Sequence, residues 1–112
     1  MKGLTTHVLD LALGQPARGL SLDLDVLDGD AWRPLGAFLT DRDGRCGDLL
    51  GGAPLVAGTY RLTFETGAYF AATGRPTFYP RVEVTFQVTE PGQHHHVPLL
   101  LSPFGYSTYR GS

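Results

Sequence analysis

Hydrophobic and polar residues alternate along much of this chain, a pattern typical of β-strands that bury one face and expose the other. The clearest example is residues 20–26, where leucine or valine alternates with serine or aspartate. Similar alternation predicts further strands at 7–13, 59–66 and 81–89. We also expect strands at 31–39, where the chain returns from a turn, and in the apolar run after the three consecutive histidines. Between two of these strands, Asp28-Gly29-Asp30 has the chemistry of a hairpin turn. The pattern therefore predicts an all-β protein.

One segment departs from this alternation. Between Gly67 and Gly74 lie alanine, aromatic and threonine residues, enough for about two helical turns. It is the only helix that we predict. Fifteen glycines and eight prolines divide the rest of the chain into short segments joined by turns. Roughly seven or eight short strands at this spacing are typical of a β-sandwich.

Size, charge and cysteine content narrow the class of protein. The 112 residues fit a single domain, residues 1–112. The net charge of −2 gives no reason to expect nucleic acid or an anionic membrane as a partner, and no apolar run approaches the roughly 18 residues of a membrane helix. Cys46 is the single cysteine, so it forms no intramolecular disulfide, and we interpret it as an inert thiol. Since no export signal is evident, we expect a cytoplasmic protein.

The last nineteen residues carry more apolar and aromatic side chains than a frayed chain end usually does. Strand periodicity predicts one core face, made of His95, Val97, Leu99 and Leu101. The opposite face holds His94, His96, Pro98, Leu100 and Ser102. Its mixture of imidazole, proline and leucine suits contact with another subunit. Because proline donates no ladder hydrogen bond, Pro98 predicts an edge strand or a bulge.

Several polar residues could carry chemistry, and each also has a simpler interpretation. A lone histidine such as His7 is more often a surface or packing residue than a catalyst. Arg45, after an Asp-Gly turn, could be a solvated loop arginine, although in a pocket its planar guanidinium would suit the carbonyl and anionic edge of a heterocycle. His94 and His96 could join His7 as the three imidazoles of a zinc site. That alternative is weaker because no carboxylates are evident to orient the histidines.

Two motifs indicate a known family. His-Val-Pro-Leu-Leu-Leu-Ser-Pro at 96–103 and Tyr-Ser-Thr-Tyr-Arg-Gly-Ser at 106–112 resemble the 5-hydroxyisourate hydrolases, the transthyretin-related enzymes of purine breakdown. The resemblance covers essentially the whole chain and implies a transthyretin-like β-sandwich of two four-stranded sheets with one short helix. It also implies hydrolysis of 5-hydroxyisourate to 2-oxo-4-hydroxy-4-carboxy-5-ureidoimidazoline in urate degradation. The assembly that it implies is a homotetramer, a dimer of dimers.

The same resemblance implies roles for individual residues. The Thr-His-Val-Leu-Asp setting makes His7 catalytic, the histidine before Val-Pro makes His96 its catalytic partner, and Asp-Gly-Arg makes Arg45 a substrate arginine. His95 stands where the family usually has an aromatic residue. The closing residues are implied to bind substrate: Tyr109, Arg110, Gly111 and Ser112. No cofactor or metal is implied. The alternative is a small-molecule carrier on the same fold, which should lack His7, Arg45 and the closing motif, while a purely structural sandwich explains none of them.

Overall fold

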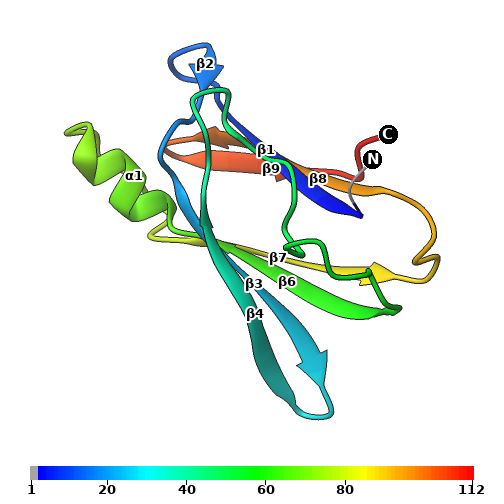
Figure 1. Cartoon of the computed structure of the whole chain (residues 1–112). Coiled ribbons are helices and arrows are strands. Elements are labelled where there is room, and N and C mark those ends of the chain that lie inside the picture. Colours follow the sequence, from blue (N-terminus) through cyan, green and yellow to red (C-terminus); the bar gives the residue numbers. More distant parts are fainter. Residues whose placement is uncertain (1–2) are drawn as a thin grey trace.

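The computed structural model describes residues 3–112 as two β-sheets that pack face to face, with one short helix at one end (Figure 1). The elements in chain order are β1 (Leu4–Asp10), β2 (Gln15–Pro16), β3 (Ser21–Asp28), β4 (Ala31–Leu39), β5 (Arg45–Cys46), β6 (Gly58–Phe64), α1 (Thr66–Ala72), β7 (Val82–Val88), β8 (His95–Ser102) and β9 (Gly105–Thr108). Within the described part of the chain, no helix is long and apolar enough to cross a membrane.

The two sheets differ in strand order and strand direction. The first has the strand order β2-β1-β8-β9, with β5 also paired to β1, and the second has the order β4-β3-β6-β7. β1 and β8 run parallel, so strands from the two ends of the chain lie side by side in the first sheet (Figure 1). The predicted all-β sandwich with one short helix is confirmed. The first sheet has five strands, not four, because the two-residue strands β2 and β5 both pair with β1.

The core lies between the sheets and consists largely of the apolar side chains that alternate with polar ones along the sequence. In β3, Leu22 and Leu24 are buried while Asp23 between them is exposed. Burying each such side chain contributes roughly 1.5–3 kcal/mol. The largest fully buried side chains are Tyr60, Phe64, Phe70, Leu4, Leu20, Leu22, Leu24, Leu49, Leu62, Leu99, Leu101 and Val8.

The first strand begins and ends earlier than the predicted 7–13. β1 covers Leu4–Asp10, and the following residues form a turn. The Asp10 carboxylate accepts a hydrogen bond from the Leu13 backbone N–H at 3.2 Å, and Gly14 has a φ of +66°, which favours glycine. Leu11 and Leu13 continue the alternation in sequence but are about half exposed. Local turn chemistry therefore overrides the hydrophobic pattern here.

The prediction that Pro98 marks an edge strand or a bulge is wrong. β8 is an inner strand between β1 and β9, and its pairing with β1 runs through Pro98 without a register shift. The ladder between β8 and β9 ends at the pair Leu99 and Thr108. Pro98 lies just beyond it, where the missing N–H costs no sheet hydrogen bond. Its carbonyl still accepts a hydrogen bond from the Thr108 hydroxyl at 2.7 Å. The predicted core face of this strand, which includes His95 and Leu99, is confirmed.

A buried carboxylate connects α1 to the first sheet. Asp10, whose side chain is fully buried, accepts hydrogen bonds from the Arg75 guanidinium at 2.6 Å and from the Tyr69 hydroxyl at 2.8 Å. Burial alone would raise the pKa of Asp10, but these hydrogen bonds and the one from Leu13 outweigh it and hold the pKa below its usual range. The helix, predicted at 67–74, is thereby fixed to the end of β1. Residues 77–80, between the helix and β7, form no strand.

Candidate active site

Two strand pairings of β1 bring predicted site residues together on the outer face of the first sheet. Thr5 and His7 belong to the half-buried residues of β1 that face away from the core. The parallel pairing with β8 places Thr5 opposite His96, and the antiparallel pairing with β5 places His7 opposite Arg45. Residues from three distant parts of the sequence therefore surround β1.

The loop before β5 explains how Arg45 reaches this face. The Asp41 carboxylate accepts hydrogen bonds from the backbone N–H groups of Asp43 at 2.9 Å and Arg45 at 3.0 Å. Gly44 between them has a φ of +76°, and a side chain there would collide with the Val8 carbonyl oxygen. The turn thus needs glycine to approach β1 so closely. A two-residue strand shows no alternation, so the sequence pattern could not predict β5.

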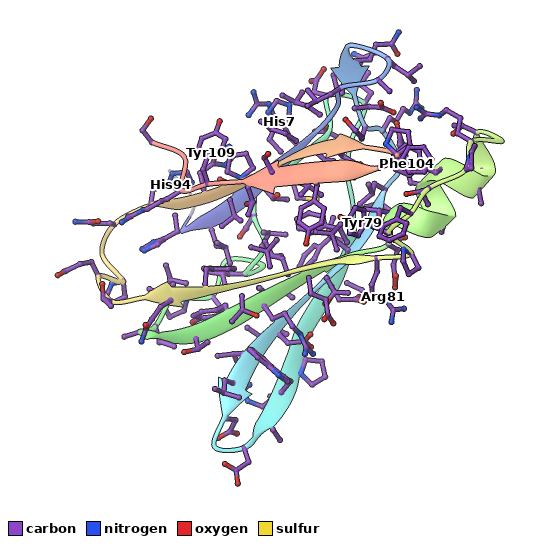
Figure 2. The ribbon with its side chains drawn as sticks, turned by 180° about the vertical axis from the view of Figure 1, so that it is seen from behind. His7, Tyr79, Arg81, His94, Phe104 and Tyr109 are labelled. Carbon is purple, nitrogen blue, oxygen red and sulfur yellow. The ribbon has the colours of Figure 1, made fainter. Side chains whose placement is uncertain are left out.

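A cavity of about 440 Å³ lies on this outer face, a volume in the range of small-molecule sites. Its lining comprises Thr5, Thr6, Arg45, Cys46, Gly47, His94, His96 and Ser112. Three of the predicted site residues, Arg45, His96 and Ser112, therefore share one cavity. His7 is not part of the lining but lies beside it as the strand partner of Arg45. Figure 2 shows His7 and His94 on the first sheet, away from the aromatic residues beside α1.

The surroundings of His96 favour the neutral form of its imidazole. Burial lowers its pKa below the usual 6.5, and the nearby His94, Arg45 and His7 lower it further because each disfavours another positive charge. Hydrogen bonding to the Thr5 backbone raises the pKa and acts in the opposite direction. At neutral pH the imidazole therefore keeps a lone pair that can accept a proton.

His7 is oriented by the turn that delivers Arg45. Its Nε2 lies 2.8 Å from the backbone carbonyl oxygen of Asp43. Since a carbonyl only accepts hydrogen bonds, Nε2 must carry the hydrogen. In the neutral ring Nδ1 is then the nitrogen with a free lone pair. The loop that positions Arg45 thus also fixes which ring nitrogen of His7 carries the hydrogen in the neutral form.

The chain end closes one side of the site. The backbone N–H of Gly111 donates to the His96 carbonyl oxygen at 2.8 Å, so the tail continues beside β8 after β9 ends. A Cβ at Gly111 would lie 2.5 Å from Cδ2 of the His96 ring. Glycine therefore lets the tail pass directly against the imidazole and brings Ser112 to the cavity.

Tyr109 and Arg110, which precede Gly111 in the tail, do not line the 440 Å³ cavity. Tyr109 is more than half exposed, and the Arg110 guanidinium donates to the Gln93 side-chain oxygen at 3.0 Å. Both line a second, smaller cavity of about 230 Å³ that also includes β7 residues. His96 lines both cavities. Within the single chain, Tyr109 and Arg110 therefore share a cavity with His96 but not with Arg45 and Ser112.

Sequence reasoning missed Thr5 and gave no role to His94, yet both line the cavity with His96. Thr5 is two residues before His7 on one strand face, so strand periodicity could have identified it. Its position opposite His96 depends on the parallel pairing of β1 with β8, which no local pattern indicates. His95 faces the core, where its ring Nδ1–H donates to the Gln93 carbonyl oxygen at 2.9 Å.

The zinc alternative finds no support in the geometry. Among residues 3–112, no group of three or more His, Cys, Asp or Glu side chains is arranged to hold a metal ion. His94 and His96 instead stack with ring centroids 6.2 Å apart. Cys46 also lines the cavity, but its thiol donates to the Leu39 carbonyl oxygen at 3.3 Å. Burial and the nearby Asp41 raise the pKa of this thiol, which favours the unreactive form.

Fold and site together define a transthyretin-like β-sandwich with histidines and an arginine around a cavity on the outer face of one sheet. The chain belongs to the HIUase/Transthyretin family, whose model matches residues 4–111. It is similar to 5-hydroxyisourate hydrolase 2 of Rhizobium meliloti (strain 1021), with 51% identity over 114 aligned positions that cover 97% of this chain and 95% of that protein.

Two solved structures show that the fold alone does not settle the activity. The Klebsiella pneumoniae 5-hydroxyisourate hydrolase has a TM-score of 0.86 and 42% identity, covering 97% of this chain and 98% of that one. Sea bream transthyretin in complex with thyroxine has a TM-score of 0.90 and 32% identity, covering 96% of this chain and 93% of that one. The backbone is thus slightly more similar to the transthyretin, and the sequence is more similar to the hydrolase. The side chains at the site must therefore decide between enzyme and carrier.

Proposed function

We propose that this chain is an enzyme, a 5-hydroxyisourate hydrolase of urate degradation. It opens the six-membered lactam ring of 5-hydroxyisourate to give 2-oxo-4-hydroxy-4-carboxy-5-ureidoimidazoline. The observation that carries the proposal is the cavity that Arg45, His96 and Ser112 share, with His7 beside Arg45. The hydrolases to which the chain is similar over nearly its whole length act on this substrate by name. A carrier gives no reason for two histidines with ordered ring nitrogens.

Hydrolysis of a lactam by water needs a base for the proton of water and donors for the oxyanion that develops on the carbonyl. We assign the proton transfers to His96 and His7. The water oxygen bonds to the carbonyl carbon, the ring C–N bond breaks, and the proton taken by imidazole returns to the departing nitrogen. Arg45 holds the carbonyl and anionic edge of the substrate. This mechanism consumes only water and uses no cofactor or metal.

Tail residues complete the proposed pocket. Ser112 lines the cavity next to His96, and Gly111 holds the tail against the His96 backbone. Tyr109 and Arg110 lie at the adjoining smaller cavity, so we assign them a supporting part in substrate binding, from the side of the tail that faces β7.

Turnover with excess substrate distinguishes an enzyme from a carrier. A small amount of protein is mixed with freshly made 5-hydroxyisourate, and the ultraviolet absorbance is followed. An enzyme converts many equivalents per chain, also after exhaustive chelation, whereas a carrier binds at most about one equivalent per site and leaves the rest to decay spontaneously. Loss of turnover on chelation that zinc restores would instead favour a three-histidine metal site.

We also infer that the chain assembles as a homotetramer, a dimer of dimers. Large apolar side chains are exposed on the single chain at Leu11, Leu13, Phe104 and Tyr106, and contiguous exposed apolar surface is typical of interfaces. β7 and β9 are the last strands of their sheets, and such edges can pair with another copy. The face of His96, Pro98 and Leu100, which we expected to need a partner, is already partly covered because Pro98 is buried and the other two are half-buried.

A cytoplasmic location is the remaining part of the proposal. The only cysteine is a buried free thiol, as is common in a reducing compartment. Fractionation of cells that produce the protein tests this, and recovery in an exported fraction would contradict it.

A further inference from the structure

The Thr5 hydroxyl lies between two histidines on the wall of the cavity. Its Oγ1 is 2.7 Å from Nδ1 of His96 and 2.9 Å from Nε2 of His94. The parallel register of β1 and β8 creates this arrangement, because it sets Thr5 directly opposite His96. The adjacent Thr6 behaves differently: its hydroxyl is buried and donates to the Val97 carbonyl oxygen at 2.6 Å. Thr6 thus serves the core, whereas Thr5 contacts ring nitrogens at the site.

This geometry couples the protons of the two imidazoles. A threonine hydroxyl has one hydrogen to donate, so it can donate to one ring and must accept an N–H from the other. If Thr5 donates to His94, then Nδ1 of His96 carries the hydrogen and Nε2 of His96 has the lone pair. If Thr5 donates to His96, then the hydrogen of His96 lies on Nε2 and no lone pair remains for a proton.

We propose that Thr5 is a positioning residue that holds the His96 ring with its hydrogen on Nδ1, so that Nε2 is the base that takes the proton from water. This inference rests on the proposed hydrolysis, in which His96 acts as a base. The Thr5 hydroxyl accepts a hydrogen bond from Nδ1–H of His96 and donates a hydrogen bond to Nε2 of His94. When Nε2 of His96 takes up the proton, Nδ1–H keeps the same acceptor. The step therefore breaks no hydrogen bond around the ring.

The other groups around His96 cannot take over this task. His94, Arg45 of β5 and His7 of β1 all oppose the charged imidazolium, and hydrogen bonding to the Thr5 backbone favours it. The side-chain contact to Nδ1 comes from the Thr5 hydroxyl. Without the Thr5 hydroxyl, the ring would lose the side-chain contact at Nδ1 that orients it. The loss should therefore affect the chemical step more than substrate binding.

Three variants test the role of the hydroxyl. Thr5→Val keeps the shape of the side chain but removes the hydroxyl, Thr5→Ser keeps the hydroxyl, and Thr59→Val makes the same change on a half-buried residue of β6 in the other sheet. We expect Thr5→Val to lower kcat about 10–100-fold, as when the partner that orients a metal-bound histidine is lost, with a smaller change in KM. Thr5→Ser should stay within about threefold of wild type, and Thr59→Val should leave kcat unchanged. A wild-type kcat for a folded Thr5→Val protein would overturn the proposal.

Nitrogen NMR of the histidine rings tests the same proposal without substrate. In wild type and Thr5→Ser at a pH where the ring is neutral, His96 should give the shifts of a single tautomer with its hydrogen on Nδ1. In Thr5→Val the two tautomers should mix. A wild-type His96 with its hydrogen on Nε2 would overturn the proposal, even if Thr5→Val does not fold. Absence of turnover in wild type would instead contradict the proposed hydrolysis. The NMR result would still show which tautomer of His96 Thr5 selects.

Discussion

At the scale of single residues, the charge of His96 determines whether it can act as a base. Burial and then the nearby His94, Arg45 and His7 lower its pKa. A histidine that must act as a base gains from this, because its neutral form persists to lower pH than that of a free histidine. The lower pKa also makes the nitrogen less basic, an effect that hydrogen bonding to the Thr5 backbone partly offsets.

The pH dependence of the reaction follows from that shift. A base works in its neutral form, so activity falls as the pH drops through the pKa of His96, and a lowered pKa moves this fall below the usual 6.5. We expect kcat/KM to be close to its plateau at pH 7 and to decline only below about 6.5. The measurement is the profile of kcat/KM from about pH 5 to 8, where histidine normally titrates. A flat profile, or a midpoint above 6.5, would contradict the assignment.

At the scale of elements, the fully buried Asp10 carboxylate fixes α1 to β1 through Arg75 and Tyr69. Replacing it with asparagine removes the charge at nearly constant shape. We expect Asp10→Asn to lower the free energy of unfolding by about 3 kcal/mol at pH 7, the lower end for a broken buried ion pair, because the partly exposed Arg75 can reach water. Asp30→Asn, in the exposed hairpin turn, is the control and should change it by less than about 0.5 kcal/mol.

The difference in unfolding free energy between wild type and Asp10→Asn should also depend on pH. The folded-state pKa of Asp10 lies below its usual 3.8. Its stabilising contribution is therefore complete above that value and is lost as the pH falls through the lower folded-state pKa. Urea unfolding at pH 7 and near pH 3 should show the difference between wild type and Asp10→Asn shrinking at the lower pH. A difference that grows on acidification would show that the carboxylate is not held charged by Arg75.

The tail is a second element whose position can be tested by one methyl group. Gly111→Ala would place a Cβ 2.5 Å from the His96 ring, so either the tail or the imidazole must move. We expect kcat to fall by about tenfold or more, as small displacements at a reacting group often cause, while the melting temperature changes little. Gly105→Ala, in β9, meets nothing within 4 Å and serves as the control. Equal activity of the two variants would show that the tail does not shape the site.

The elements also show what the sequence could predict. Alternation identified β3, β6 and β7 closely because apolar side chains on one face of each strand are buried. The turn at Asp28-Gly29-Asp30 identified β4, which has no buried residue. Alternation failed at Leu11 and Leu13, where an aspartate and a glycine turn the chain, and at β5, which is too short to alternate. The resemblance implies roles for His7, Arg45 and His96, but Thr5 lies beside His96 through the parallel register of β1 and β8, and His94 contacts Thr5 there. That pairing is a tertiary property that no local segment contains.

At the scale of the whole molecule, an exposed aromatic side chain provides a test of the assembly. In the single chain Phe104 is 69% exposed, so replacing it should cost little unless another copy covers it. We expect sedimentation of wild type at the mass of four chains and of Phe104→Asp at a lower mass with an unchanged circular dichroism spectrum. Val56→Asp, also exposed but on the loop before β6, should leave the assembly intact. A monomeric wild type with full activity would contradict the proposed tetramer.

The central claim is that His7, Arg45 and His96 hydrolyse 5-hydroxyisourate together. Its most direct test is the decay rate of freshly made 5-hydroxyisourate with catalytic amounts of wild type and of His7→Ala, Arg45→Ala and His96→Ala. Arg33→Ala is the control, since Arg33 is an exposed arginine whose ion-pair partner is Asp28. We predict rapid decay with wild type and with the control, and rates lower by about 10²-fold or more for each of the three site variants. Wild-type protein that leaves the spontaneous rate unchanged, or three folded variants that keep the wild-type rate, would contradict the account.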